Sequence, residues 1–375
     1  MDLSFWEINE WIKDIDYVIV GSGIVGINCA LQLRKNFPES KIIILEKGIL
    51  PQGASTKNAG FACFGSISEI LDDLKSHSEN EVFKLVQKRW KGLKKLREIV
   101  GDVGLDFQEN GGIELFLENE EALFTECEKN IPRINKLLFP IFNSDVFQVV
   151  ETPNNFSKTT SKIIVNKLEG QIDTGKMMSS FLKLTTLQDI KIINQTEVIS
   201  YLDYEENVEI ETNNFTFKSK KIFFATNGFS EKLVTSDVIP ARAQVLITEP
   251  IENLNIKGTF HIEKGYYYFR NFNNRIILGG GRNLDFEGET TTEFGITEKI
   301  QNKLENLLKE VILPNQDFKI AHRWSGIMGM GKTKNPIVKQ LSDNVFCGIR
   351  LGGMGIAIGT LIGQQLADLL NGNKN

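Results

Sequence analysis

Residues 16–47 follow a spacing that few folds accommodate. An apolar run over 17–20 enters Gly21-Ser22-Gly23-Ile24-Val25-Gly26, a helix-compatible stretch follows, and a second apolar run over 41–45 ends at Glu46. Such short apolar runs are typical of buried parallel strands. A glycine turn between strand and helix lets the backbone approach a pyrophosphate, and the helix N-terminus offers it unpaired N–H groups. The stretch therefore predicts a βαβ unit that binds a dinucleotide, with Glu46 accepting hydrogen bonds from a ribose. The alternative is an ordinary glycine turn in an α/β domain.

The composition restricts the class of protein further. A chain of 375 residues suffices for two domains, and its 41% apolar and 24% charged residues fit a soluble globular protein. The net charge of −5 gives no overall basic field for nucleic acid, and we interpret the basic run over 84–97 as the solvated face of a helix. We see neither a secretory signal nor a membrane span. Four scattered cysteines and three histidines lack disulfide or metal-ligand spacing, so we expect a cytoplasmic protein without a metal.

A second glycine cluster, Gly352-Gly353-Met354-Gly355-Ile356, lies between a predicted strand over 344–349 and a helix that extends to residue 370. Glycine permits positive φ and close approach, and the positive end of the helix points at the turn. A reduced flavin carries negative charge on one edge of its ring, so this turn is a candidate for binding that edge. The alternative is a packing turn, because Gly355, Gly359 and Gly363 recur every four residues.

The rest of the chain predicts an interleaved architecture. Residues 53–60 have the small and polar composition of a loop, 67–100 are expected to be helical, and short strands alternate with turns from about residue 239. We predict an α/β fold (α+β overall), in which a Rossmann-like nucleotide-binding domain is interleaved with an antiparallel-sheet substrate domain. The segments assigned to the first domain are 1–78, 172–235 and 320–375, and those assigned to the second are 79–171 and 236–319.

Together these segments resemble the D-amino-acid oxidase-like family of FAD-dependent oxidoreductases, which includes glycine and sarcosine oxidases. The resemblance covers most of the chain and rests on the order of its motifs: 16–26, Leu45-Glu46-Lys47, 53–60, Phe224-Ala225-Thr226-Asn227-Gly228, 276–280, Arg323-Trp324-Ser325-Gly326 and the terminal glycine cluster. It implies that the dinucleotide is FAD. The positions it implies for FAD binding are Gly21, Ser22, Gly23, Ile24, Val25, Gly26, Glu46, Lys47, Ser55, Thr56, Lys57, Asn58, Ala59, Gly60, Val198, Ala225, Thr226, Gly352, Gly353, Met354, Gly355 and Ile356.

The chain differs from members of this family at positions that those enzymes use to bind substrate, oxygen or flavin. Ile327-Met328-Gly329 stands where glycine-oxidase-like enzymes carry a carboxylate-binding Arg. Ile277 stands where sarcosine-oxidase-like enzymes use a Lys to promote reaction with oxygen, and the Cys that holds their flavin is absent from 327–328. We therefore expect noncovalent FAD. The sequence does not decide between oxygen and another electron acceptor.

Candidate substrate-binding residues come from one predicted strand and from the surroundings of the flavin. Alternate residues of a strand share a face, so Tyr266, Tyr268 and Arg270 are predicted to present two phenols and a guanidinium fork that suits a carboxylate. The alternative is that the aromatic rings pack the sheet and Arg270 makes a structural ion pair. Arg350 and Met328 are further candidates, although Arg350 also fits a residue that neutralises a nearby acid.

The resemblance implies an enzyme that transfers a hydride from the nitrogen-bearing carbon of an amino acid or secondary amine to the flavin, after which the imine hydrolyses. Because the cofactor supplies the chemistry, no catalytic side chain is assigned. The alternatives are a 2-hydroxy-acid dehydrogenase with an acceptor other than oxygen and a flavin-binding protein without turnover. The expected partner is a small amine, amino acid or hydroxy acid, with no nucleic acid.

Overall fold

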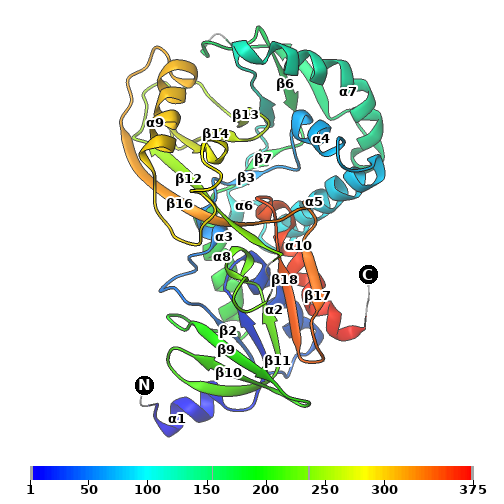
Figure 1. Ribbon diagram of the computed structural model, residues 1–375, viewed down its shortest axis with the longest axis vertical. Coiled ribbons are helices and arrows are strands. Elements are labelled where there is room, and N and C mark those ends of the chain that lie inside the picture. The colour runs from blue at the N-terminus through cyan, green and yellow to red at the C-terminus, as the bar shows by residue number, and fades with distance from the viewer. Residues whose placement is uncertain (1–2, 154, 235–236, 373–375) are drawn as a thin grey trace.

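The computed structural model describes residues 3–153, 155–234 and 237–372. Two eight-stranded sheets and one two-stranded sheet organise this part of the chain. Figure 1 shows the two large sheets in opposite halves of an elongated molecule. The predicted fold class, a Rossmann-like half combined with an antiparallel half, is confirmed. Among the described residues, no helix combines the length and the apolar character that crossing a membrane requires.

The first sheet has a parallel centre in the order β18-β11-β1-β2-β8. Its strands are β1 (Ile15–Val20), β2 (Ile42–Leu45), β8 (Lys191–Ile193), β11 (Thr216–Phe224) and β18 (Val345–Ile349). One face packs against α2 (Ile24–Asn36), α8 (Thr174–Leu187) and α10 (Gly355–Asp368). The other face is covered by β10 (Val208–Thr212) and β9 (Val198–Asp203), which belong to the same sheet because β10 pairs with β11 and β9 pairs with β10. Burial on both faces explains why Val18, Ile19 and Ile43 are fully buried.

The second sheet has the order β16-β12-β15-β14-β13-β4-β6-β5, with β13 and β4 as its parallel pair. Its strands are β4 (Gly112–Glu114), β5 (Phe147–Glu151), β6 (Lys162–Asn166), β12 (Ile239–Thr248), β13 (Thr259–Ile262), β14 (Tyr267–Phe272), β15 (Arg275–Gly280) and β16 (Ile320–Met330). One face packs Tyr267 and Phe269 against α9 (Glu298–Leu307) and the turn of π-helix that follows it, Leu308–Ile312. The opposite face presents Val245 and Tyr268 to a cavity.

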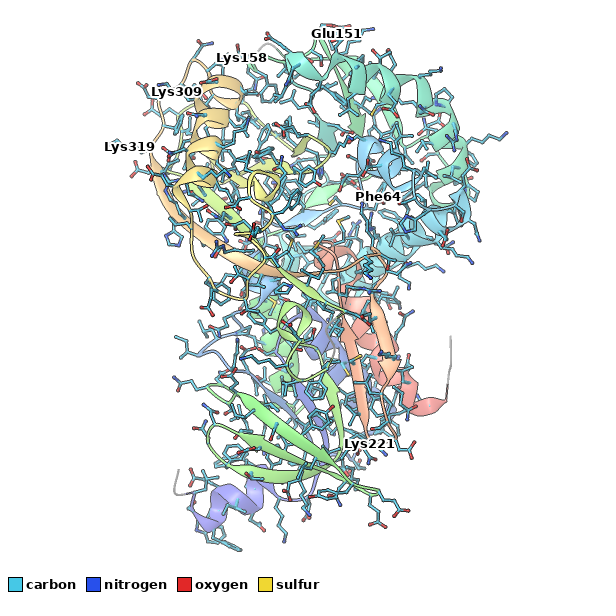
Figure 2. The ribbon with its side chains drawn as sticks, in the orientation of Figure 1. Phe64, Glu151, Lys158, Lys221, Lys309 and Lys319 are labelled. Atoms are coloured by element: carbon cyan, nitrogen blue, oxygen red, sulfur yellow. The ribbon has the colours of Figure 1, made fainter. Side chains whose placement is uncertain are left out.

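Helices α4 (Ile67–Asp73), α5 (Glu79–Val100) and α7 (Glu121–Phe142) form a separate cluster beside the second sheet. Phe64 is fully buried among them, with its ring centroid 4.6 Å from that of Phe142. Figure 2 shows Phe64 in the interior, whereas the labelled Glu151, Lys158, Lys309 and Lys319 lie at the outer surface. The remaining α-helices and strands are α1 (Phe5–Glu7), α3 (Ala54–Lys57), β3 (Phe61–Ala62), α6 (Asp102–Leu105), β7 (Gly170–Gln171) and β17 (Ile337–Gln340).

Several local expectations differ from the structure. The helical stretch predicted over 67–100 is two helices, because Ser78 and Glu81 form a capping box that begins α5. Tyr266 precedes β14 rather than opening it. Residues 320–330, which the sequence assigns to the FAD-binding segments, form β16, and β16 pairs with β12 between Ile239 and Thr248. The domain boundaries themselves stay a prediction.

The C-terminal part of helix α5 packs against the first half of the molecule through Leu93 and Leu96, and α5 approaches α10 closely at Gly92. A Cβ atom on Gly92 would lie 2.0 Å from the carbonyl oxygen of Ala357 in α10. This separation is far below any van der Waals contact, so only glycine permits the approach of the two helices. The contact fixes α5 against the first turn of α10.

Candidate functional site

A continuous cavity of about 510 Å³ runs from the carboxyl ends of β1 and β2 to the face of the second sheet. Ligands of open α/β sheets bind at this end of the strands. Of the FAD-binding positions that the sequence predicts, those that line the cavity are Gly21, Gly23, Ile24, Val25, Glu46, Lys47, Ser55, Lys57, Asn58, Ala59, Val198, Ala225, Thr226, Gly352, Gly353, Met354, Gly355 and Ile356. Ser22, Gly26, Thr56 and Gly60 do not line the cavity.

The first glycine turn leaves no room for side chains. Gly21 has φ +103°, which L side chains rarely adopt, and a Cβ atom there would lie 3.0 Å from the carbonyl oxygen of Ala225. A Cβ on Gly26 would lie 1.9 Å from the carbonyl oxygen of Gly21. Gly26 therefore lets α2 pack directly on the turn, and Gly21 leaves the backbone open to a ligand.

Glu46 is held at the end of β2 by donors from two loops. Its carboxylate accepts hydrogen bonds from Ser22 N at 3.1 Å, Ser22 Oγ at 2.6 Å and Gly48 N at 3.0 Å. Glu46 is only 6% exposed and still lines the cavity. Ser22 thus positions the carboxylate from behind, and the acid faces the space that a nucleotide ribose would fill.

The segment over 53–60, predicted as a loop, contains the short helix α3 and is ordered by its own polar side chains. Asn58 Nδ2 donates to Ser55 O at 2.8 Å, and Asn58 Oδ1 accepts from Gly60 N at 2.9 Å and from Thr174 Oγ1 at 2.7 Å. Ser55 Oγ accepts from Ile24 N at 2.9 Å, which brings the loop to the N-terminus of α2. Trp324 Nε1 donates to Lys57 O at 2.9 Å and ties the loop to β16.

The second glycine turn also opens to the cavity. Gly352 and Gly353 have φ +58° and +79°, and no side chain caps the N-terminus of α10. Asn227, which the sequence interpretation gave no role, holds this turn: its Oδ1 accepts from Arg350 N at 3.1 Å and Leu351 N at 3.2 Å. Thr226 Oγ1 is buried at the cavity wall without a hydrogen-bond partner. A buried hydroxyl of this kind indicates that a polar ligand belongs there.

The far end of the cavity is a charged chamber, which we define by Phe61, Glu69, Arg89, His261, Tyr268 and Arg282. The ring of Phe61 meets those of His261 and Tyr268 edge-on, with centroids 5.4 and 5.5 Å away. Burial raises the pKa of Tyr268 to about 12, so its phenol stays protonated at neutral pH. Tyr266 and Met328, both predicted from the sequence, also line the cavity, and Tyr266 is 42% exposed.

Two predicted substrate-binding arginines do not line the cavity. Tyr268 and Arg270 share a face of β14 as expected, but the loop at Ala59 and Gly60 covers Arg270, which is 3% exposed. The Arg270 guanidinium donates to the carbonyl oxygens of Ala59, of Ile172 at 2.9 Å and of Asn271 at 3.1 Å, and burial lowers its pKa to about 10. Arg350 Nε donates to Asn335 O at 2.9 Å. Neither arginine therefore belongs to the substrate site that the cavity defines.

The sequence interpretation missed most of the charged chamber. Arg89 belongs to the basic run that we interpreted as solvated, yet it is 4% exposed. Its spacing from Val86 and Leu93, both buried, places it on the inner face of α5. This spacing is the sequence signal that could have identified Arg89 as buried. Glu69, His261 and Arg282 come from three other parts of the chain, and no local pattern connects them.

His261 stands between two carboxylates. Its Nδ1 is 4.0 Å from Glu69 Oε2, and its Nε2 is 3.8 Å from Glu169 Oε2. Burial raises the pKa of Glu169. Burial also opposes ionisation of Glu69, but His261, Lys334 and Arg89 together with the Ser66 amide lower its pKa overall. The pKa values of the two acids are thus shifted in opposite directions, and Glu69 is the acid that faces the cavity.

Glu114, behind this pair, makes the stability of the fold depend on pH. Its carboxyl group accepts from Ser68 N at 3.1 Å and from Ser68 Oγ, and burial raises its pKa from 4.5 to about 7. Its contribution to stability is full below pH 4.5 and is lost as the pH rises through 7, by roughly 3 kcal/mol at most. We expect Glu114→Gln to be more stable relative to the wild type at pH 8 than at pH 5. Urea unfolding of both proteins at both pH values measures this, and an equal difference at the two pH values would contradict it.

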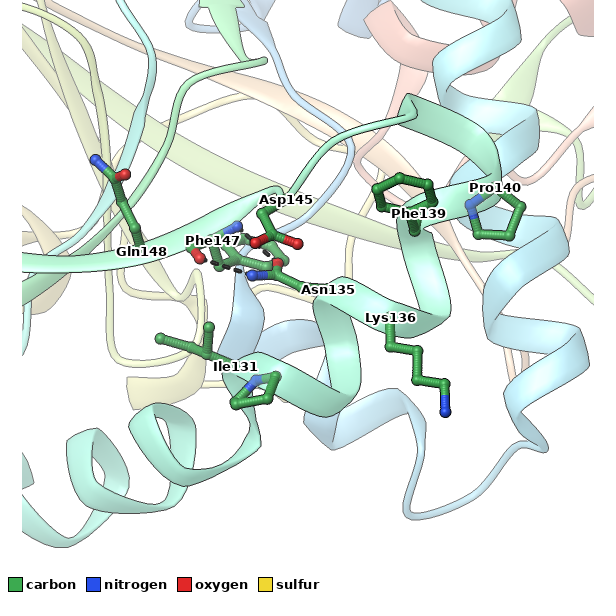
Figure 3. A pocket seen from close by; sticks show the side chains of 9 residues that line it. Ile131, Asn135, Lys136, Phe139, Pro140, Asp145, Phe147 and Gln148 are labelled. Atoms are coloured by element: carbon green, nitrogen blue, oxygen red, sulfur yellow. Dashed lines mark hydrogen bonds between the residues drawn. The ribbon is translucent and has the colours of Figure 1, made fainter.

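A second hollow lies outside this region, on the surface between α7 and β5 (Figure 3). Asn135 Oδ1 accepts from Val146 N at 3.1 Å and Phe147 N at 2.9 Å, and its Nδ2 donates to Phe147 O at 2.9 Å. These bonds fasten the helix to the strand. They use both ends of the amide, so Asn135 has a structural role here.

Fold and cavity together define a protein that binds a dinucleotide beside a chamber for a small molecule. Residues 16–369 match the sequence model of the FAD dependent oxidoreductase family (DAO), and the chain belongs to this family. The predicted FAD cofactor and oxidoreductase class are thereby confirmed.

Individual relatives are distant. The chain is 19% identical to the probable oxidoreductase OrdL of Haemophilus influenzae, over 96% of this chain and 84% of that protein. It is 20% identical to the gamma-glutamylputrescine oxidoreductase of Escherichia coli, over 98% and 86%. Among solved structures it is similar to L-proline dehydrogenase from P. horikoshii (TM-score 0.76, 18% identity, 97% of this chain and 95% of that chain). Glycine oxidase from Geobacillus kaustophilus gives a TM-score of 0.75 at 17% identity, over 96% and 95%.

Proposed function

We propose that this FAD-dependent oxidoreductase oxidises the C–N bond of an amino acid or a secondary amine. The observation that carries the proposal is the continuity of one cavity, from the glycine turn at Gly21 past the turn at Gly352 into the charged chamber. A small molecule in the chamber therefore reaches the part of the cavity that faces the α10 turn. The names of similar proteins, which refer to γ-glutamylputrescine, proline and glycine, support a nitrogen-containing substrate.

The residues present fit FAD. The glycine turns exclude side chains, Thr226 Oγ1 lacks a partner, and the N-terminus of α10 has no side-chain cap. Glu46 would accept hydrogen bonds from the ribose, Ile24 and Ser55 would face the pyrophosphate, and Gly352 to Ile356 would face the ring. The chemistry that bound FAD would supply at this site is that of a hydride acceptor for the substrate carbon. Phe61 and Tyr268 exclude water from that space and orient the substrate.

An anaerobic titration tests the proposed reaction. We expect the yellow colour of the purified holoenzyme to bleach with at least one amino acid or secondary amine, because hydride transfer reduces the cofactor without oxygen. Bleaching by 2-hydroxy acids alone would replace the amine substrate with a hydroxy acid. Bleaching by dithionite but by no member of either panel would instead indicate a flavin-binding protein without turnover.

We also propose that FAD is bound noncovalently. Ile327 and Met328 occupy the stretch where related enzymes attach flavin to a cysteine. Cys63, which lines the cavity, is buried, and burial raises its thiol pKa well above 9. Acid precipitation is therefore expected to release the colour into the supernatant, and colour in the pellet would contradict this.

A cytoplasmic location stays a proposal, supported by four buried cysteines that are all free.

A further inference from the structure

Two arginines of the charged chamber lack a carboxylate partner, whereas Glu69 and the acids beside the chamber each have a basic neighbour. Glu69 faces His261 at 4.0 Å, Asp72 lies 3.6 Å from Lys264 Nζ, and Lys334 Nζ lies 2.5 Å from Asp73. Each of these acids thus has a basic partner. Arg89 and Arg282 also line the cavity, and neither has a carboxylate within 4.0 Å among the described residues.

Arg89 is a buried cation with free donors. It is 4% exposed, its Nη1 donates to Phe64 O at 2.8 Å, and its Nε is buried without an acceptor. A guanidinium has five N–H donors, and the Phe64 carbonyl is its one hydrogen-bond acceptor in the part of the chain that the structure describes. Burying a charge without a partner is costly, so such residues are normally paired with an anion.

Arg282 faces the chamber from the other side. It follows β15, its guanidinium carbon lies 5.0 Å from the centroid of the Phe286 ring, and its Nε is buried without an acceptor. The turn at Gly265 and Tyr266 contacts both sides of the chamber. On the side of Arg89, a Cβ on Gly265 would lie 3.0 Å from Glu69 Oε1. On the side of Arg282, Gly281 N donates to Tyr266 O at 3.0 Å. Both arginines therefore border the same space.

From these two unpaired guanidinium groups we infer that the substrate is an amine that carries two acidic groups. Arg89 binds one acidic group and Arg282 binds the other, because guanidinium forks match carboxylate oxygens in charge and geometry. A second positive charge on the substrate is disfavoured, since Glu69 and Asp72 already lie opposite the basic side chains of His261 and Lys264. The inference rests on the proposed function for the amine, but the binding of acids can be measured without turnover.

Glutarate and butyrate, which differ by one carboxylate, provide the direct comparison. We expect the holoenzyme to bind glutarate at least about tenfold more tightly than butyrate, as one extra charge-assisted contact provides. Perturbation of the visible flavin spectrum and titration calorimetry both give the dissociation constants. Equal affinities, or tighter binding of 1,4-diaminobutane than of glutarate, would overturn the inference.

Substitutions then assign the preference to the two arginines. Arg282→Gln removes the charge at a half-buried position, and Arg89→Lys keeps a charge in the buried position but removes the fork. Each variant is expected to reduce the ratio of glutarate to butyrate affinity by about tenfold. A merely structural defect would weaken both ligands and leave the ratio unchanged. Arg133→Gln, which breaks a surface pair with Glu79, is the matched control and should keep the wild-type ratio.

The outcomes separate this inference from the proposed function. A glutarate preference without bleaching by any amine would retain the anion site and reject amine oxidation. Bleaching by amines with equal glutarate and butyrate affinities would retain the reaction and reject the two-acid substrate. A glutarate preference that survives in both arginine variants would also reject the assignment.

Discussion

Gly26→Ala is expected to yield a protein that retains little or no FAD and unfolds at lower denaturant concentration than the wild type. The added Cβ atom would lie 1.9 Å from the carbonyl oxygen of Gly21 and 3.2 Å from Ile19 Cγ2. Neither the turn nor β1 can move without distorting the first sheet, and overpacking of this kind costs about 3 kcal/mol. The better helix propensity of alanine returns up to about 1 kcal/mol.

Gly175→Ala is the matched control for this change. Gly175 also lies in the first part of a helix, α8, but its added Cβ would meet only Asp173 Oδ1, at 3.2 Å, the end of a side chain. This variant should keep FAD and unfold at no lower urea concentration than the wild type, because alanine has the better helix propensity. The ratio of flavin to protein absorbance and a urea unfolding curve measure both effects. Full FAD occupancy and an unchanged midpoint in Gly26→Ala would show that the turn is looser than described.

Arg270→Met is expected to lower the free energy of unfolding by about 3–5 kcal/mol, because it leaves buried carbonyl groups without donors. Arg270 donates to carbonyl oxygens of Ala59, Ile172 and Asn271, and so joins β14 to the loop that borders the cofactor site. Methionine has a similar length but no donor. The loss should therefore appear in stability and in FAD retention, rather than in the Michaelis constant alone.

Arg323→Met provides the comparison. The Arg323 side chain is 25% exposed and donates to Glu305 Oε1 at 2.7 Å and to Gln301 Oε1 at 2.6 Å, so its loss should cost about 2 kcal/mol or less. Chemical denaturation of the three proteins gives the free energies. If Arg270→Met were as stable as the wild type and only its Michaelis constant rose, the substrate-binding role predicted from the sequence would be restored.

The nucleotide-binding half was predictable because its information is local. Strand, glycine turn, helix, strand and acid follow one another between residues 16 and 47, and each has a physical role that its residue type reveals. The C-terminal glycine turn is equally compact. Most positions predicted for the cofactor line the cavity for this reason.

The charged chamber was not predictable in the same way. Its residues come from β3, α4, α5, β13, β14 and the segment after β15, so only the packing of these separate elements brings them together. Arg270 illustrates the limit of strand periodicity. The period of two correctly placed it on the face of Tyr268, but it could not reveal that the loop at Ala59 and Gly60 covers that part of the face.

Helix α5 connects the two ends of the cavity, because it contacts both of them and moves as one rigid element. It carries Arg89 into the charged chamber and, three residues later, sets Gly92 against Ala357 O at the beginning of α10. Any tilt of α5 that adapted Arg89 to a longer or shorter substrate would press on the beginning of α10 and on the glycine turn before it, which lines the cavity. Selection for a new substrate size at Arg89 would therefore act on cofactor affinity as well, and the two properties should evolve together in this protein.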